Sequence, residues 1–365
     1  MDPALERLVK DERCHFMLDP SDPQGIRRIN FGTFNGNVSE RADMLATTGR
    51  DTCAPDHAQF KRLMSQWGFA FAPSAMHSAR TTGFGGFHLS MEAAFTKIDD
   101  GASYWKFGTQ GPDDPSSGKS SIKNNSPAPV LALYSAKIRK SFGFGLELTG
   151  TVGFMPKTSI ISGGADVRMS LLEGFRLGVG GILPDLAVGG GVRTISGTPQ
   201  FQLTTVGLDV QISKPLPIQD SSVITPWFGY QYVWIFADSG LIDTTPATDP
   251  VGFCGFSGPN VPGNPDIGRD DKNPSPDHHV YDGQPVCNNG SPLDFNNNVV
   301  FDKARLERQR LIFGLNYRYE NAMVGGEFIT DIVNPADAQD DDKDKATLEG
   351  EDRQWTLVFE LGAMF

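Results

Sequence analysis

The sequence lacks long hydrophobic runs. No stretch of about 18 consecutive apolar residues occurs, so a transmembrane helix is excluded. Apolar residues make up 39% of the chain, and its mean hydropathy is −0.28. The apolar residues come in short stretches that contain many of the 41 glycines, and glycine disfavours helix. The composition therefore favours β-structure. A net charge of −12 also makes nucleic acid an unexpected partner, because phosphate contacts need basic side chains.

Cysteine is scarce, with four residues in the chain: Cys14, Cys53, Cys254 and Cys287. None of them has the close spacing of a zinc site. They fall into two pairs that are local in the sequence, and we expect two disulfides, which suit an oxidising periplasm or cell surface. Four unpaired thiols in a cytosolic protein remain the alternative.

The last stretch of the chain, residues 353–365, alternates with period two. This period predicts a strand rather than a helix. Its length suits a tilted crossing of a bilayer, which needs roughly 9–11 residues. One face is apolar and the other accepts charge. The apolar face consists of Trp355, Leu357, Phe359, Leu361, Ala363 and Phe365.

This final stretch resembles the closing strand of bacterial outer-membrane β-barrels. In that family the terminal aromatic residue is read by the barrel-assembly machinery, so the resemblance implies that Phe365 is the assembly signal and that the machinery is a partner. The glycine-to-aromatic spacing is shifted relative to the usual signal. Taken alone, the strand is also compatible with the edge of a soluble sheet.

The same period-two pattern recurs upstream and decides between these readings. We count ten strands, an even number as in such barrels, which predicts an all-β fold, a transmembrane antiparallel up-and-down β-barrel. Two unrecognised strands within 66–83 or 173–185 would give twelve. The predicted strands cover residues 84–98, 130–140, 144–154, 161–171, 186–195, 205–212, 227–236, 310–319, 324–332 and 353–365.

Residues 1–83 form a mostly non-barrel, partly helical segment, and residues 84–365 form the barrel. Helical patterns over 3–12 and 56–67 predict an ordered periplasmic piece or a plug that enters the barrel from the periplasm. Three long connections (99–127, 239–306 and 334–352) fall on one side, and short turns (141–143, 216–221 and 320–322) fall on the other. This asymmetry places the long loops outside and both chain termini in the periplasm.

The resemblance implies the outer membrane of a Gram-negative bacterium, with membrane lipid and lipopolysaccharide as surroundings. The first residues, Met1 to Glu6, show neither a basic n-region nor an apolar h-region. We therefore expect either the mature form with an added Met or a start that is placed too late. A periplasmic or surface protein is a further candidate partner.

The second face of the predicted strands carries seven acids and six bases. A buried charge must be paired or solvated, and a barrel of about ten strands is only slightly wider than one that side chains fill. We expect a lumen network of Glu92, Lys137, Arg139, Glu147, Asp166, Arg168, Arg193, Asp209, Arg310, Arg318, Glu327, Asp331 and Glu360.

A closed or narrow lumen favours a structural, docking or surface-exposed module. The alternative is a narrow channel or transporter for small or hydrophobic solutes, whose charges line a water-filled path. Asp277, His278, His279 and Asp282 lie in a long loop but show neither EF-hand nor HExxH spacing. We therefore expect no catalytic, metal or cofactor site and no enzymatic activity; a surface hydrolase is the third, least favoured hypothesis.

Overall fold

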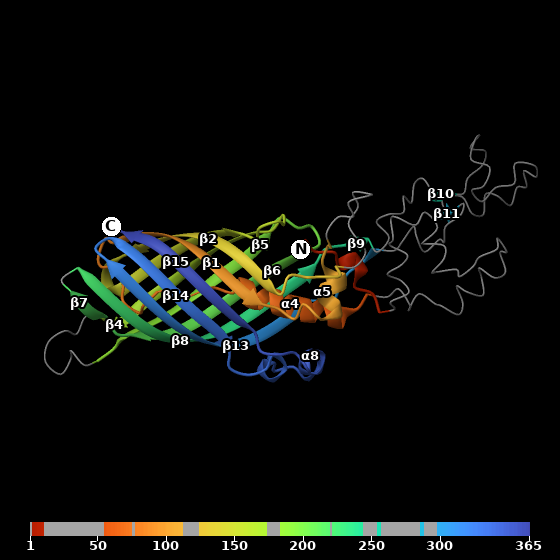
Figure 1. Ribbon diagram of the computed structural model, residues 1–365. Coiled ribbons are helices and arrows are strands. Elements are labelled where there is room, and N and C mark those ends of the chain that lie inside the picture. Colours follow the sequence, from red (N-terminus) through yellow and green to blue (C-terminus); the bar gives the residue numbers. More distant parts are fainter. Residues whose placement is uncertain are drawn as a thin grey trace, which may run out of the picture.

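Ten antiparallel strands close into a barrel in the described part of the chain (Figure 1). The computed structural model describes residues 2–10, 55–74, 77–111, 124–173, 183–219, 221–243, 254–256, 285–287 and 298–365. The barrel strands are β1 (Phe87–Lys97), β2 (Val130–Ser141), β3 (Leu146–Phe154), β4 (Ile161–Leu172), β5 (Asp185–Ser196), β6 (Phe201–Ser213), β8 (Ser222–Ser239), β13 (Ala304–Tyr319), β14 (Ala322–Asp331) and β15 (Trp355–Met364).

Each barrel strand pairs with the next along the chain, and β15 pairs with β1 to close the ring. At this seam the Phe87 N–H donates to the Phe365 carbonyl at 3.0 Å, and the Phe365 N–H donates back at 2.7 Å. The prediction of a ten-strand up-and-down barrel is confirmed. The twelve-strand alternative fails at residues 66–71, which belong to a helix, α4 (His57–Phe71).

The smaller elements lie in the connections between the barrel strands and in the N-terminal segment. The helical ones are η1 (Leu5–Arg7), α5 (Ser103–Gly108), η3 (Gly143–Gly145), η6 (Pro335–Ala338) and α8 (Asp342–Leu348). The short strands are β7 (Leu216–Gln219), β9 (Ile242–Asp243), β10 (Cys254–Phe256), β11 (Pro285–Cys287) and β12 (Asn298–Val299). Residues 216–219 were expected in a turn, but they pair with the start of β8.

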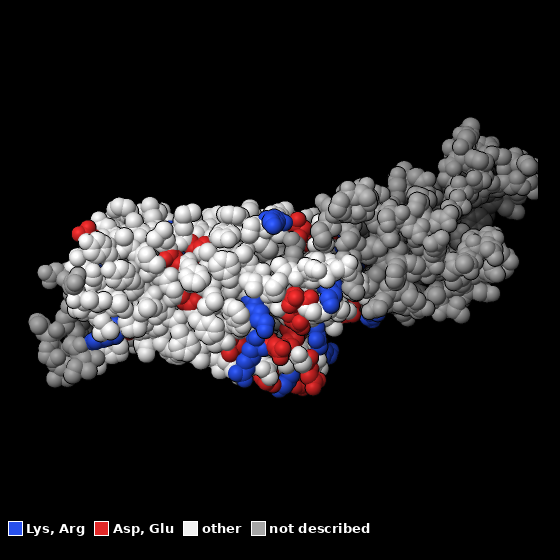
Figure 2. Space-filling model, in the orientation of Figure 1, with Lys and Arg blue, Asp and Glu red and all other residues white. Residues whose placement is uncertain are grey.

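The outer wall of the barrel is apolar. Outward side chains such as Met91, Val152 and Leu361 are exposed (72%, 68% and 63%), while the inward side chains beside them are buried. Figure 2 shows an almost uncharged wall, with charged side chains gathered around α8. A continuous apolar surface of this size marks a partner or a membrane, and here it encircles a barrel. None of the described helices is long and apolar enough to cross a bilayer.

Aromatic side chains stand at both rims of this apolar wall. Tyr317, Tyr319 and Phe365 are exposed at one end of the strands; toward the other end Phe236 is exposed on β8 and Trp355 is half-buried at the start of β15. Tyrosine and tryptophan prefer the headgroup level, where one side of the ring is apolar and the other is wet. Their positions therefore mark the two borders of a lipid-facing belt.

The two ends of the barrel differ in their connections. At the end that holds Phe365, which we call the turn end, strands are joined by short links such as 142–145 and 320–321. At the opposite end, which we call the loop end, long connections follow β1, β8 and β14 and carry α5, β9–β12 and α8. The three connections predicted to be long lie at the loop end, whereas the turn end also holds the longer connection 173–184 between β4 and β5.

For the predicted disulfides, the structure gives only the backbone pairing of one cysteine pair. In the connection after β8, β10 pairs with β11 so that Cys254 stands directly opposite Cys287. Their disulfide stays a prediction. Cys14 and Cys53 lie outside the described residues, as do Asp277, His278, His279 and Asp282.

We predict that the folded protein, extracted from outer-membrane fractions, migrates faster on a gel before boiling than after. A closed ring of strands has no free edge from which detergent can unravel it, so the unheated form stays compact. The measurement is a pair of lanes, unheated and boiled. Recovery in the soluble fraction without a mobility shift would contradict a membrane barrel.

Candidate functional site

Helix α4 occupies the lumen at the loop end. Asp56 caps its start, where the carboxylate accepts a hydrogen bond from the Gln59 N–H at 3.0 Å, and Pro73 follows its end. The helix is buried on most sides. At Gly68 an added Cβ would stand 2.5 Å from Ile235, so the absence of a side chain lets the helix approach the wall of β8.

Around α4 the loop-end half of the lumen is apolar. Trp67 stacks on Phe71 and on Trp105 of α5, and it meets Phe201 edge-on with ring centroids 5.6 Å apart. The wall contributes inward apolar side chains to the same cluster, namely Leu131, Ile195, Leu203, Val233, Ile235 and Leu306. The predicted network of lumen charges does not extend into this half, which an apolar cluster fills instead.

The N-terminal segment lies at the loop end, opposite Phe365. The Ala4 N–H donates to the Gly108 carbonyl at 2.9 Å, Phe60 stacks on Phe301 at 4.9 Å, and Lys61 forms an ion pair with Asp344. All three partners belong to connections of the loop end (Figure 1). The expectation that both termini lie at one end of the barrel is therefore wrong.

Two buried arginines of β13 fix the end of α4 to the wall. Arg308 donates to Asp331 at 3.1 and 2.6 Å and to the Ser65 hydroxyl of α4 at 2.7 Å. Arg310 donates to the Phe69 carbonyl at 3.1 Å and to the Pro73 carbonyl at 2.7 Å. Both guanidinium groups also lie over the Phe69 ring, 4.9 and 5.3 Å from its centroid.

Beyond α4, Ser74, His77 and Ala79 contact the wall of the polar half of the lumen. The Ser74 hydroxyl contacts Glu92 at 3.1 Å and accepts a hydrogen bond from Lys137 at 2.8 Å, and these two charged groups form an ion pair. The Ala79 N–H donates to the Ser213 hydroxyl at 3.1 Å. The segment is therefore tied to several strands at successive depths.

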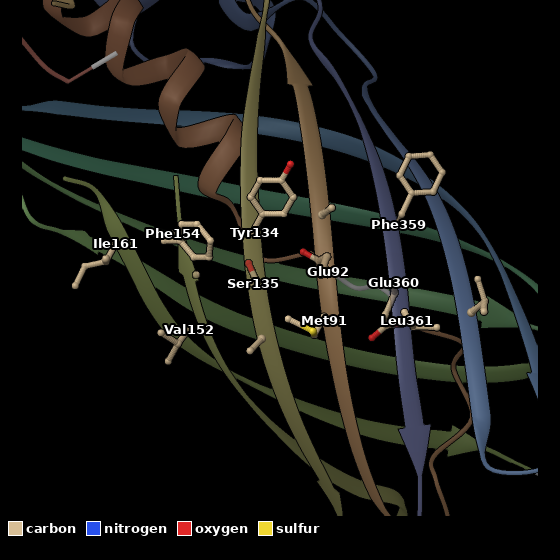
Figure 3. A pocket seen from close by; sticks show the side chains of 14 residues that line it. Met91, Glu92, Tyr134, Ser135, Val152, Phe154, Ile161, Phe359, Glu360 and Leu361 are labelled. Atoms are coloured by element: carbon tan, nitrogen blue, oxygen red, sulfur yellow. The ribbon is translucent and has the colours of Figure 1, made fainter. Parts of the chain in front are cut away.

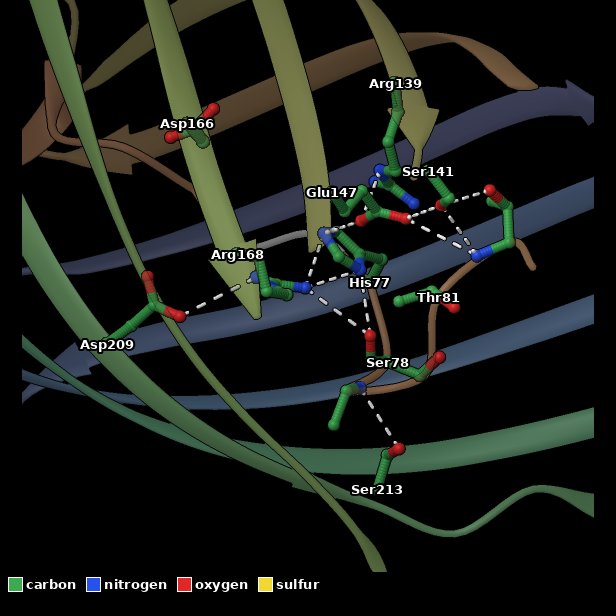
Figure 4. A network of polar contacts seen from close by, with 12 residues as sticks. His77, Ser78, Thr81, Arg139, Ser141, Glu147, Asp166, Arg168, Asp209 and Ser213 are labelled. Atoms are coloured by element: carbon green, nitrogen blue, oxygen red, sulfur yellow. Dashed lines mark hydrogen bonds and ion pairs between the residues drawn. The ribbon is translucent and has the colours of Figure 1, made fainter. Parts of the chain in front are cut away.

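A polar network surrounds His77 in this segment (Figure 4). Arg168 donates to the His77 ring, and the ring lies 3.4 Å from the Glu147 carboxylate. Glu147 also forms an ion pair with Arg139 at 3.4 Å, and Arg168 forms one with Asp209 at 3.7 Å. The paired charges of this network thus all belong to the wall, and the His77 ring joins them by accepting a hydrogen bond from Arg168.

The remaining predicted lumen residues fall into three groups. Arg193 pairs with Asp166 at 2.6 Å, as the expected network requires. The Glu327 and Glu360 carboxylates are buried, and Glu327 has no hydrogen-bond partner among the described residues. Arg318 differs from the expectation, because it is exposed at the last turn-end residues of β13 rather than buried in the lumen.

Sequence reasoning missed Arg308 and His77. Arg308 lay outside the predicted strand, which began at residue 310, because its outward neighbours Glu307 and Gln309 are polar and the apolar alternation that marks a lipid-facing strand is absent there. His77 stands in an irregular segment with no periodicity at all. The only available signal was the row of small residues in 68–83, which suits a chain confined inside a barrel.

The described lumen holds little free space. One small cavity lies beside Phe69 and Ser74 and another beside His77, each of about 20 Å³, enough for about one water. A larger apolar hollow of about 710 Å³ lies on the outer wall among Tyr134, Phe154 and Phe359 (Figure 3). In the described ranges no group of three or more His, Cys, Asp or Glu is arranged to hold a metal ion.

The geometry is that of an outer-membrane β-barrel. No family model and no curated protein matches the chain. Among solved structures, it is similar to Ail, the attachment invasion locus protein of Yersinia pestis (9% identity, 78% of this chain and 100% of that chain, TM-score 0.25). It is also similar to the N-terminal β-barrel domain of Pseudomonas aeruginosa OprF (7%, 76% and 97%, 0.25) and to the translocator domain of autotransporter NalP from Neisseria meningitidis (8%, 78% and 89%, 0.29).

We predict that Asp331→Asn lowers the stability of the barrel and that Glu327→Gln does not. Both acids lie on β14 and are buried, but Asp331 accepts two hydrogen bonds from Arg308 while Glu327 accepts none from the described residues. Removing one partner of a buried pair costs about 3–5 kcal/mol, whereas neutralising an unpaired buried charge is neutral or stabilising. The measurement is the temperature at which the fast-migrating form is lost. Equal losses in both variants would contradict the assignment.

A second prediction concerns pH at the loop end. Burial raises the pKa of Glu351, which lies between α8 and β15, to about 7. The folded state therefore binds this proton more tightly than the unfolded state, so the stabilisation it gives is present at low pH and is lost as the pH rises through about 7. We expect proteolysis of the 334–352 connection to be faster at about pH 8.5 than at about pH 5.5.

The matched controls are Glu351→Gln, which should abolish this difference, and Asp352→Asn at the exposed neighbouring position, which should keep it. A pH dependence that survives in Glu351→Gln would show that another group is responsible.

Proposed function

We propose that this chain is a closed outer-membrane barrel that acts as a structural, docking or surface-exposed module rather than as a diffusion pore. The observation that carries the proposal is the filled lumen: α4 and the segment that follows it occupy the interior and are hydrogen-bonded to the wall. An anchor needs a stable barrel but no continuous path through it.

Two successive barriers support a closed lumen. A solute that enters from the loop end meets the aromatic cluster around Trp67, which excludes water and ions because they would lose their hydration there. Beyond it lies the network around His77, whose charges are already paired. Opening a path would require both layers to give way, and the cavities between them hold about one water each.

The placement in the membrane follows from the two different ends. Barrels of this kind carry short turns in the periplasm and long loops outside, so we place the loop end at the cell surface. The apolar belt then contacts lipid, and the acidic residues around α8 lie near lipopolysaccharide headgroups. Phe365, paired with Phe87 at the seam, remains the proposed assembly signal.

The rival function is a narrow channel, and conductance separates the two. We predict that the purified protein is silent in planar bilayers. In Arg310→Met the carbonyls of Phe69 and Pro73 lose their donors, so the end of α4 loosens and intermittent openings appear. Arg318→Met, on the same strand but at an exposed position, is the matched control and should stay silent.

A stable unitary conductance of the unaltered protein would contradict the closed barrel and support the channel. All three proteins are first checked for heat-modifiable migration, so that a silent record comes from an inserted barrel and not from a misfolded one.

A further inference from the structure

In addition to the ten strands, the segment that precedes β1 extends from one end of the barrel to the other. Ten strands return it to the end where it started, and the hydrogen bonds between Phe87 and Phe365 show that β1 begins and β15 ends at the turn end. The segment that precedes β1 comes from the other end. Residues 2–10 and the start of α4 contact only connections of the loop end in the bonds described above.

The extra crossing runs through the lumen. Arg310 holds Pro73 near the level of α4, Ser74 contacts Glu92 and Lys137, and His77 contacts Glu147 and Arg168 farther along. At the turn end the Thr82 N–H donates to the Ser141 hydroxyl, the last residue of β2, at 3.2 Å. These contacts follow one another in chain order from one end of the barrel to the other.

We propose that the barrel holds its own N-terminal segment across the membrane, so that residues 2–10 and the start of α4 lie on the side of the long loops while Phe365 faces the periplasm. This rests on the proposed outer-membrane location. The same chain then supplies the barrel, the segment that fills its lumen and the N-terminal residues that are held at its loop end.

The packing explains why the N-terminal segment would stay at the loop end. Leu5, Leu8, Phe60 and Trp67 are fully or almost fully buried in the apolar cluster at the loop end. Withdrawal toward the turn end would pull these side chains past the charged groups around His77. Each of these large apolar side chains would lose its packed apolar surroundings on the way, so retraction is strongly opposed.

The test uses the full chain with a short epitope inserted at one of three exposed positions: after Lys10, between Asp340 and Asp341 at the loop end, or after Asn321 at the turn end. Antibody labelling is compared between intact and permeabilised cells. We expect the Lys10 and Asp340 insertions to be labelled in intact cells and the Asn321 insertion only after permeabilisation.

Labelling of the Asp340 insertion but not of the Lys10 insertion in intact cells would overturn the display of the N-terminal segment and leave the closed barrel standing. Labelling of Asn321 alone in intact cells would overturn it through a reversed orientation. Failure of all three proteins to enter the outer membrane, with loss of the heat-induced shift in the unaltered chain as well, would instead overturn the proposed function.

A second measurement does not depend on insertions. The hydroxyls of Thr82 and Ser141 lie 2.6 Å apart, so Thr82→Cys combined with Ser141→Cys should form a disulfide between the lumen segment and the end of β2. The boiled, non-reduced double variant should migrate differently from both single variants. Absence of this bond in a heat-modifiable barrel would contradict the contact with β2 at which the crossing ends at the turn end.

Discussion

The interior of the barrel depends on the hydrogen bonds between two arginines of β13 and the end of α4. The guanidinium groups of Arg308 and Arg310 both lie over the Phe69 ring. Most of their N–H groups donate hydrogen bonds to Asp331, Ser65 and the carbonyls of Phe69 and Pro73. Two adjacent cations can be buried here only because those acceptors come from both wall and helix. The helix is therefore part of the electrostatic balance of the barrel, not an accessory placed inside it.

This balance explains why the lumen has two zones. Where α4 fills the interior, the wall presents apolar side chains, because a helix can cover them and exclude water. Where only an extended segment passes, the wall presents charges, because one strand of chain cannot shield a wide apolar surface. The wall is therefore apolar where it faces the helix and charged where it faces the extended segment.

The sequence predicted the outer wall well and the interior only in part. Lipid imposes strict alternation on strands such as residues 353–365, so strand number, facing and the sorting of loops could be read directly. The extension of β13 to Arg308 could not, because outside the lipid belt Glu307 and Gln309 replace the apolar residues. The route of residues 72–86 carries no periodicity, since its partners come from many different strands.

The continuity of the lumen segment with β1 has a mechanical consequence. A pull on the N-terminal segment at the loop end would be carried by the bonds of Arg310, Ser74 and His77 and then by β1, which forms one side of the seam with β15. β1 is hydrogen-bonded to β2 on one side and to β15 on the other, so a load that reaches it is shared with both neighbours. The closing seam therefore lies on the path along which tension on the N-terminal segment would be borne.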